Sequence, residues 1–299
     1  MRFLFVDRIL QLSPGQFIRG LKHVTPDDFY LCKDDKGKLA FITSLIGETL
    51  GQLAAWNVMS TNNFTKRPVA GFANSARIYR KAFVGDTLLL ESFIDSLDDT
   101  AVQYHSVARI GDEVVFTIDG ALGPLLPMDD FIDSSTVRRQ FDEINRPGEW
   151  PWPTPPTERL PLLPTTDNQL ISAPMVFDRV IEHVPGVSMS AEKKISYAAP
   201  YFPDHFPKKP VLPLTVLLEC SLNLATLFLA DSPYAGQYKV SEVRRVKMSD
   251  FVYPSDVVLC YLTVKIHQTE KLILNCRIEV EGKRVCILDV VMLPKEREQ

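Results

Sequence analysis

The sequence predicts an α+β fold of two similar units, each an antiparallel β-sheet wrapped around one long buried helix. The first indication is an internal repeat, because an offset of 171 residues separates Asp7 from Asp178 and also Glu48 from Glu219. The second is that each copy contains one long apolar segment without turn residues. The third is a series of apolar segments separated by tight-turn residues, which is typical of an antiparallel meander.

Each unit is expected to present the same elements in the same order. A short strand or turn leads through a Pro-Gly dipeptide into an alternating strand, which is followed by the helix and by further strands. In the first unit these segments are 6–10, 17–23, the helix 41–59, and the strands 69–82, 87–96, 102–110 and 114–122. In the second unit they are 176–181, 187–197, the helix 213–230, and the strands 237–251, 257–267, 272–280 and 284–293.

Both helical segments are apolar on all sides apart from a few small or polar positions. This pattern is typical of a buried helix rather than one on the surface. A single carboxylate in such a helix is costly unless it has a partner, so Glu48 and Glu219 each need a reason to be there.

The repeat also indicates the domain limits. Residues 1–126 are expected to form the first unit and residues 175–299 the second, joined by a linker over 127–174. The first part of this linker is charged and predicts a short helix over 129–144. Its second part is rich in proline, which favours an extended chain that spans a long distance stiffly.

Composition argues against several classes of function. The formal net charge of -4 gives no overall indication of nucleic-acid binding. The five cysteines are scattered and lack a C-x-x-C pair, which predicts reduced core residues in a cytoplasmic protein without a metal site. The N-terminus becomes charged too early for a secretory signal. No apolar run reaches the ~18–20 residues that a membrane span needs without a charge.

The two copies differ at one chemically important place. His205 lies in the run Asp204-His205-Phe206-Pro207, fourteen residues before Glu219, whereas Asp34 stands at the corresponding position of the first copy. The other four histidines have no such context. A duplicated fold with an unduplicated histidine predicts one working site rather than two.

At these residues the chain resembles the hotdog-fold β-hydroxyacyl-acyl-carrier-protein dehydratases of fatty-acid synthesis. The resemblance rests on Phe5–Ile9, on Tyr201–Pro213 with its His-Phe-Pro motif, on Leu217–Glu219, and on Ala70–Arg77 followed by a Gly-Asp turn. It covers both units but not the linker, and it implies a double hotdog packed as an internal pseudo-dimer. In this family the site forms between two subunits, and the histidine of one faces the helix carboxylate of the other.

The resemblance therefore implies that His205 of the second unit pairs with Glu48 of the first. The implied reaction is dehydration of a (3R)-hydroxyacyl thioester to the trans-2-enoyl thioester, in which His205 removes the α proton and Glu48 protonates the leaving hydroxyl. Burial in an apolar helix is expected to keep the acid form of Glu48 available. The backbone amide of Leu214 is the expected donor to the thioester oxygen. Glu219 is expected to be structural or vestigial, and no metal or soluble redox cofactor is implied.

The implied substrate is carried on the phosphopantetheine of an acyl carrier protein, in fatty-acid or polyketide biosynthesis. Acyl carrier proteins are acidic, so Lys208 and Lys209 are candidates for contact with the carrier. Gly47 and Gly51 lie on one helix face beside Glu48, which indicates either close helix packing or room for the acyl thioester. Neither nucleic acid nor a membrane is an expected partner, and the pseudo-dimer can assemble further into a homo-oligomer.

Other functions remain open. Asp204, Lys208 and Leu214 stand where the family usually has glycine, which favours a non-catalytic protein that binds an acyl carrier protein or serves as a scaffold. A hotdog thioesterase that uses a helix carboxylate alone is a second alternative, although it leaves His205 without a role. Polyketide-synthase dehydratase domains resemble the reverse order, with the histidine in the first half. R-specific enoyl-CoA hydratases place Asp and His close together in one half, which this chain does not.

Overall fold

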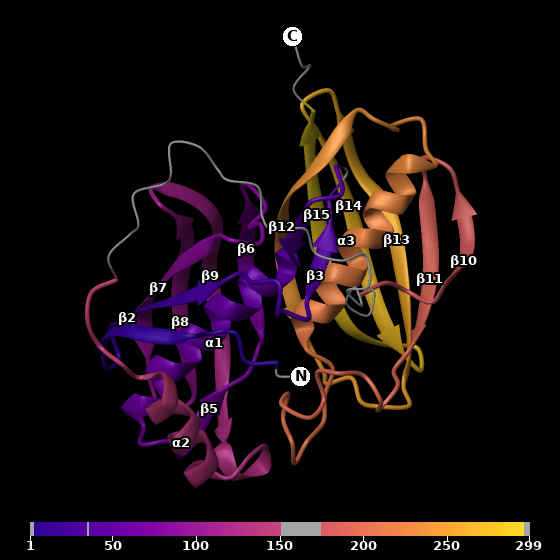
Figure 1. Cartoon of the computed structure of the whole chain (residues 1–299). Coiled ribbons are helices and arrows are strands. Elements are labelled where there is room, and N and C mark those ends of the chain that lie inside the picture. The colour runs from indigo at the N-terminus through magenta and orange to yellow at the C-terminus, as the bar shows by residue number, and fades with distance from the viewer. Residues whose placement is uncertain (1–2, 35, 151–174, 296–299) are drawn as a thin grey trace.

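The computed structural model of the chain describes residues 3–34, 36–150 and 175–295. It contains two halves of similar design, each an antiparallel sheet curved around one long helix (Figure 1). The two helices, α1 (Thr43–Thr61) and α3 (Leu214–Ala230), contact each other between the sheets. This is the double-hotdog fold, an internal pseudo-dimer, that the sequence predicts.

The strands of the two halves follow the repeat along the chain. Those of the first half are β1 (Arg8–Ser13), β2 (Phe17–His23), β3 (Leu31–Lys33), β4 (Leu39–Phe41), β5 (Lys66–Pro68), β6 (Phe72–Ile78), β7 (Thr87–Leu97), β8 (Ala101–Ile110) and β9 (Glu113–Pro127). Those of the second half are β10 (Arg179–Val184), β11 (Ser188–Lys194), β12 (Tyr238–Met248), β13 (Val257–Gln268), β14 (Lys271–Val280) and β15 (Lys283–Pro294). Their order in space is β1-β2-β7-β8-β9-β6-β12-β15-β14-β13-β11-β10, and β5 pairs with β9.

The halves join through one pair of strands, β6 and β12, which run antiparallel and make the sheet continuous. Ala76 lies opposite Val243 in this register. Next to them the buried carboxylate of Glu242 is 3.5 Å from the Arg77 side chain and 2.7 Å from that of Arg244. The cations offset the cost of burying the acid at the junction of the two halves.

Equivalent residues of the two copies make equivalent contacts. Asp7 accepts a hydrogen bond of 2.6 Å from the backbone amide of His23, and Asp178 accepts one of 2.7 Å from that of Lys194. Each aspartate therefore anchors the entry of its half to the second strand. The repeated Asp-Arg motif is structural in both copies.

The first helix begins at Thr43 rather than at the predicted Phe41. The cause is that Leu39–Phe41 pairs with Leu31–Lys33 in a small separate sheet, which takes the start of the predicted helix. This β3–β4 hairpin corresponds in sequence to the loop that carries His205 in the second half. The two copies therefore differ in backbone as well as in residue type at this place.

The predicted strand 69–82 is shorter in the structure, where it corresponds to β6 alone, and Lys66–Pro68 before it forms the separate short strand β5. Between them Gly71 approaches β9 so closely that a Cβ there would lie 3.0 Å from Pro124 Cδ and 3.1 Å from the Leu122 carbonyl oxygen. The absence of a side chain permits this contact, where the chain leaves β5 and enters the sheet.

The start of the predicted linker is folded. A 3-10 turn, η1 (Met128–Asp130), is followed by α2 (Ser134–Ile144), whose Val137 and Phe141 are buried against the first half. The proline-rich part over 151–174 lies outside the described residues.

Four of the five cysteines are buried and Cys32 is half-buried, and all five are free thiols. In the described part of the chain, no helix is both long and apolar enough to span a bilayer.

Candidate active site

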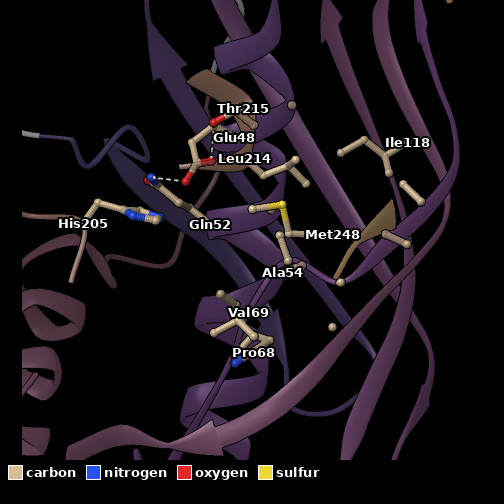
Figure 2. A pocket seen from close by; sticks show the side chains of 18 of the residues that line it. Glu48, Gln52, Ala54, Pro68, Val69, Ile118, His205, Leu214, Thr215 and Met248 are labelled. Carbon is tan, nitrogen blue, oxygen red and sulfur yellow. Dashed lines mark hydrogen bonds between the residues drawn. The ribbon is translucent and has the colours of Figure 1, made fainter. Parts of the chain in front are cut away.

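A cavity of about 230 Å³ lies between the two halves. Its walls come from α1, β5, β6, β8 and β9 of the first half, and from the loop before α3, the start of α3 and β12 of the second. Most of the lining side chains are apolar, and the few polar ones include Glu48, Gln52, His205 and Thr215 (Figure 2). An elongated apolar ligand with one reactive polar end suits such a cavity.

Glu48 projects from the middle of α1 into this cavity and has two hydrogen-bond partners. Gln52 donates its amide to Oε1 at 3.0 Å, and Thr215, from the first turn of α3, donates its hydroxyl to Oε2 at 2.7 Å (Figure 2). A hydroxyl can also accept a hydrogen bond, so this pair of partners can hold Glu48 whether the carboxyl is ionised or protonated. The acid is thus oriented by one residue from each half.

Gln52 also connects the acid to the N-terminal segment. Its amide nitrogen donates to the Phe3 carbonyl oxygen at 3.1 Å, and its amide oxygen accepts from the Phe5 amide at 2.9 Å. Gln52 was not identified from the sequence. Its position four residues after Glu48 is nevertheless a usable signal, because residues four apart share one helix face.

His205 lies in the loop before α3, and its ring faces Glu48 and Gln52 (Figure 2). Nδ1 is 3.0 Å from the Val211 carbonyl oxygen, which can only accept, so Nδ1 carries a proton and Nε2 has a free lone pair in the neutral ring. The ring packs on Phe206, with centroids 4.1 Å apart, and edge-on against Phe3 at 5.7 Å. These contacts fix the ring in the orientation that a general base requires.

The apolar surroundings lower the pKa of His205 from its ordinary value of 6.5, because desolvation disfavours the imidazolium. The charge of Glu48 and the hydrogen bond to Val211 oppose this shift, while the charge of Arg67 adds to it. His205 is therefore neutral, and able to accept a proton, across the physiological range.

We expect the catalytic rate to be maintained down to pH 6.5 and to fall only at lower pH. The lowered pKa of His205 means that its basic form persists as the pH decreases through 6.5. The lowered pKa also affects the free energy of unfolding. The contribution of His205 to stability is fully present above pH 6.5. It is lost as the pH falls further, because the unfolded chain binds the proton more readily than the folded one. The measurement is kcat/KM against pH, alongside denaturant unfolding. An acid limb above pH 6.5 would contradict this assignment.

Leu214 is the first residue of α3, so its amide has no acceptor within the helix. The residue lines the cavity and lies beside Glu48 and Thr215 (Figure 2). Its amide is in a suitable region to meet the thioester oxygen, and that role stays a prediction.

Two residues that stand in place of glycines have specific partners. The Asp204 carboxylate accepts a hydrogen bond of 2.8 Å from the Phe3 amide and so holds the N-terminal segment over the site. The Lys208 ammonium is 2.6 Å from the Asp133 carboxylate just before α2. These contacts give Asp204 and Lys208 structural roles that a glycine could not fill.

The neighbouring Lys209 lies over the rings of Phe251 and Phe131, at 4.8 and 5.4 Å from their centroids. Lys208 and Lys209 are thus both engaged in contacts within the protein. Their contact with a carrier protein stays a prediction.

The pseudo-symmetric position contains an acid but no histidine. Glu219 accepts a hydrogen bond of 3.2 Å from the Ser44 amide at the start of α1, and burial raises its pKa. Asp34, at the place equivalent to His205, closes the β3–β4 turn by accepting hydrogen bonds from the amides of Lys36 and Lys38. The structure therefore brings together one His–Glu pair and leaves Glu219 without an equivalent base.

The two helix glycines face the cavity. A Cβ on Gly47 would lie 3.4 Å from the Phe116 ring, and one on Gly51 would lie 3.6 Å from the Tyr104 hydroxyl. Phe116 and Tyr104 come from the sheet of the same half and also line the cavity. The two glycines thus leave space between α1 and the sheet of the same half, and they do not serve close packing of α1 against α3.

Replacing Gly51 with Ala is expected to raise the free energy of unfolding by up to about 1 kcal/mol, since glycine is costly within a helix. The new methyl group would make only an ordinary contact with Tyr104. It would also narrow the cavity, so kcat/KM should fall more for long acyl chains than for short ones. Denaturant unfolding and a chain-length series are the two measurements. A destabilised variant, or an unchanged chain-length profile, would contradict this view of Gly51.

Among the described residues, no group of three His, Cys, Asp or Glu side chains is arranged to hold a metal ion.

Two further polar residues of the cavity, Arg67 and Tyr104, were also not identified from the sequence. Burial raises the pKa of Tyr104 to about 12, so its hydroxyl keeps its proton. Neither residue belongs to a recognisable motif, which left no signal by which the sequence could have indicated them.

Sequence comparison with known proteins also indicates the dehydratase family. A family model described as a FabA-like domain matches residues 173–289. The chain is 32% identical over 118 residues to the 3-hydroxyacyl-[acyl-carrier-protein] dehydratase FabZ of Thermoanaerobacter sp. (strain X514), a match that covers 39% of this chain and 83% of that protein. It is 34% identical over 119 residues to FabZ of Caldanaerobacter subterraneus subsp. tengcongensis, with 39% and 84% covered.

Solved structures match nearly the whole chain. The tesB protein of Mycobacterium avium subs paratuberculosis has a TM-score of 0.58 at 11% identity, covering 97% of each chain. The dehydratase domain of PpsC from Mycobacterium tuberculosis, in complex with C12:1-CoA, has a TM-score of 0.52 at 11% identity, covering 97% of this chain and 98% of that one. At such identities the likeness shows the fold alone.

Proposed function

This chain belongs to the hotdog-fold family of 3-hydroxyacyl-[acyl-carrier-protein] dehydratases, and on that premise we propose that it dehydrates a (3R)-hydroxyacyl thioester to the trans-2-enoyl thioester. The substrate is carried on the phosphopantetheine of an acyl carrier protein. His205 is the base and Glu48 the acid. One observation carries the proposal: these two side chains, from different halves, line the same largely apolar cavity.

This arrangement of His205 and Glu48 supports the elimination of water from C2 and C3 of the substrate. Nε2 of His205 takes a proton from C2 of the substrate, and the electrons of that C–H bond form the C2–C3 double bond. The C3–O bond breaks as the hydroxyl receives a proton from Glu48 and leaves as water. Passage of a proton from His205 back to Glu48 restores the starting state. The Leu214 amide donates to the thioester oxygen while negative charge develops there.

The surroundings of the pair favour this chemistry. The lowered pKa of His205 keeps the base in its neutral form, and Val211 fixes the tautomer with Nε2 free. Gln52 and Thr215 hold the Glu48 carboxyl in the cavity. A thioesterase that activates water with a helix carboxylate alone would leave this orientation of His205 unused.

The test is to incubate the purified chain with matched 3-hydroxyacyl and trans-2-enoyl thioesters of an acyl carrier protein and of coenzyme A. We expect reversible conversion between the two thioesters, seen as the absorbance of the conjugated enoyl group, without release of free thiol. Faster turnover on the carrier protein supports the carrier-bound substrate. Thiol release would instead establish a thioesterase. Binding of the acyl carrier protein with neither reaction would leave the non-catalytic alternative.

A further inference from the structure

Arg67 is a cation placed inside the cavity without an acidic partner. It lies on the short strand β5, and its side chain is among those that line the cavity with His205 and Glu48. No carboxylate in the described part of the chain forms an ion pair with it. Its Nε is buried and has no hydrogen-bond acceptor among the residues that the structure describes. A cation that is partly buried in a cavity normally pairs with an acid, because an uncompensated charge is costly to desolvate.

The protein holds the guanidinium by stacking rather than by charge. The Arg67 guanidinium carbon is 3.8 Å from the centroid of the Phe206 ring and 5.8 Å from that of Phe131. Phe206 is the residue after His205, and the two rings are stacked at 4.1 Å. Stacking on an aromatic face orients a guanidinium while leaving its edge N–H groups available. Arg67 is thus fixed next to the catalytic histidine.

Glu48, whose charge acts on Arg67, is occupied elsewhere. Its two oxygens accept hydrogen bonds from Gln52 and Thr215. Burial lowers the pKa of Arg67 to about 9, against the opposing effect of Glu48, so the side chain is still a cation at neutral pH. The guanidinium therefore has unused donor capacity in an apolar enclosure. An acceptor supplied by a ligand would satisfy it.

The position of Arg67 limits which part of the substrate it can meet. The phosphate of a carrier is separated from the sulfur by the whole pantetheine arm, so a group stacked beside the His205 loop cannot serve that phosphate while His205 reaches C2. The Leu214 amide, at the start of α3, is the proposed donor to the thioester oxygen. Pro68 and Val69, which follow Arg67, line the cavity and lie across it from Leu214 (Figure 2), so we expect Arg67 to meet a part of the substrate beyond the thioester.

We propose that Arg67 binds a carboxylate carried by the acyl chain of the substrate, a few carbons beyond the reacting C3, so that the cavity selects short acyl thioesters with an acidic end. This inference rests on the proposed dehydratase function and specifies its substrate class. A planar carboxylate matches the fork of guanidinium donors, and the ion pair would neutralise the enclosed cation. A plain alkyl chain would leave Arg67 unpaired.

The test compares two six-carbon substrates that differ only at C6, the trans-2-hexenoyl and the trans-2-hexenedioyl thioesters of pantetheine. Both are assayed with the wild-type chain, with Arg67→Met, which removes the charge at similar length, and with Arg67→Lys, which retains it. Arg109→Met, on β8 and away from the cavity wall, is the matched control.

We expect the wild-type chain to prefer the hexenedioyl thioester in kcat/KM. Arg67→Met should lower kcat/KM for that substrate by about 10- to 150-fold, the worth of a hydrogen bond between charged groups, and should not lower it for the hexenoyl thioester. Arg67→Lys should keep part of the preference, and Arg109→Met should keep all of it. If the wild-type chain prefers the hexenoyl thioester, or if Arg67→Met leaves the ratio unchanged, the inference is wrong although the dehydratase function stands.

A failure of the proposed function gives a different pattern, in which the wild-type chain converts neither substrate. The inference is then decided by calorimetric binding of adipyl and hexanoyl pantetheine. A preference for adipyl that Arg67→Met abolishes supports the carboxylate site. Equal affinities for the two, or a preference that survives in Arg67→Met, overturns it.

Discussion

Replacing Glu48 with Gln is expected to lower kcat for dehydration by about 10²–10⁴-fold, the usual worth of a positioned general acid. The identical replacement at Glu219 should leave kcat within about twofold. The two acids occupy equivalent positions on α1 and α3, and each binds a residue at the start of the other helix. The difference is that Glu48 shares its cavity with His205, whereas the corresponding place in the other copy is a hairpin turn.

Each variant is the control for the other, because both exchange a carboxylate for an amide of the same shape in a helix of the same kind. Initial rates with a saturating enoyl thioester give kcat, and denaturant unfolding checks that both variants are folded. The free energy of unfolding of Glu219→Gln should equal or exceed that of the wild type, since burial already disfavours the charged form of Glu219. Equal loss of activity in both variants would mean that the chain has two sites or that neither acid is catalytic.

Replacing His205 with Ala should remove the base and lower kcat by about 10²–10⁴-fold, with little change in KM if the acyl chain is held mainly by the cavity walls. The backbone of the loop should persist, because the His205 amide bonds to the Tyr201 carbonyl oxygen and Phe206 is independently buried. His105→Ala is the matched control, as His105 lies exposed on β8 beside Asp95.

The same variant separates the competing functions. If His205 is the group that titrates, the residual activity of His205→Ala should no longer fall at low pH as the wild-type activity does. Thioester cleavage that persists in His205→Ala at the wild-type rate would favour a thioesterase that uses a helix carboxylate alone. Unchanged hydration in His205→Ala would refute the role of this histidine outright.

Much of the fold could be predicted from local patterns. The 171-residue offset between Asp7 and Asp178 indicated two copies, and the structure gives both aspartates the same contact with a following strand. The apolar helices were predicted to within two residues at each end. Such features depend on periodicity and turn residues, which act over a few positions and are visible in one sequence. Where the start of a predicted helix instead pairs as a strand with the segment before it, as Leu39–Phe41 does with Leu31–Lys33, the prediction was wrong.

The candidate pair, His205 and Glu48, could also be proposed from the sequence, because motif and spacing matched a family. Their surroundings could not. Thr215 lies 167 positions from Glu48, and only the packing of α1 on α3 makes them hydrogen-bond partners. Asp204, an unexplained departure in the sequence, becomes the acceptor for the Phe3 amide 201 positions away. Gln52 alone had a local signal, through its place one helical turn after Glu48.

The sequence by itself determined that this protein has two hotdog units, one histidine in a His-Phe-Pro motif and two helix carboxylates. Only the tertiary structure decided which groups surround them: that Val211 orients His205, that Thr215 and Gln52 hold Glu48, and that Arg67 is enclosed without an acid. The physical reason is that burial, desolvation and hydrogen-bond geometry belong to the packed pair of halves. They arise when β6 joins β12 and α1 meets α3, and no short stretch of sequence contains them.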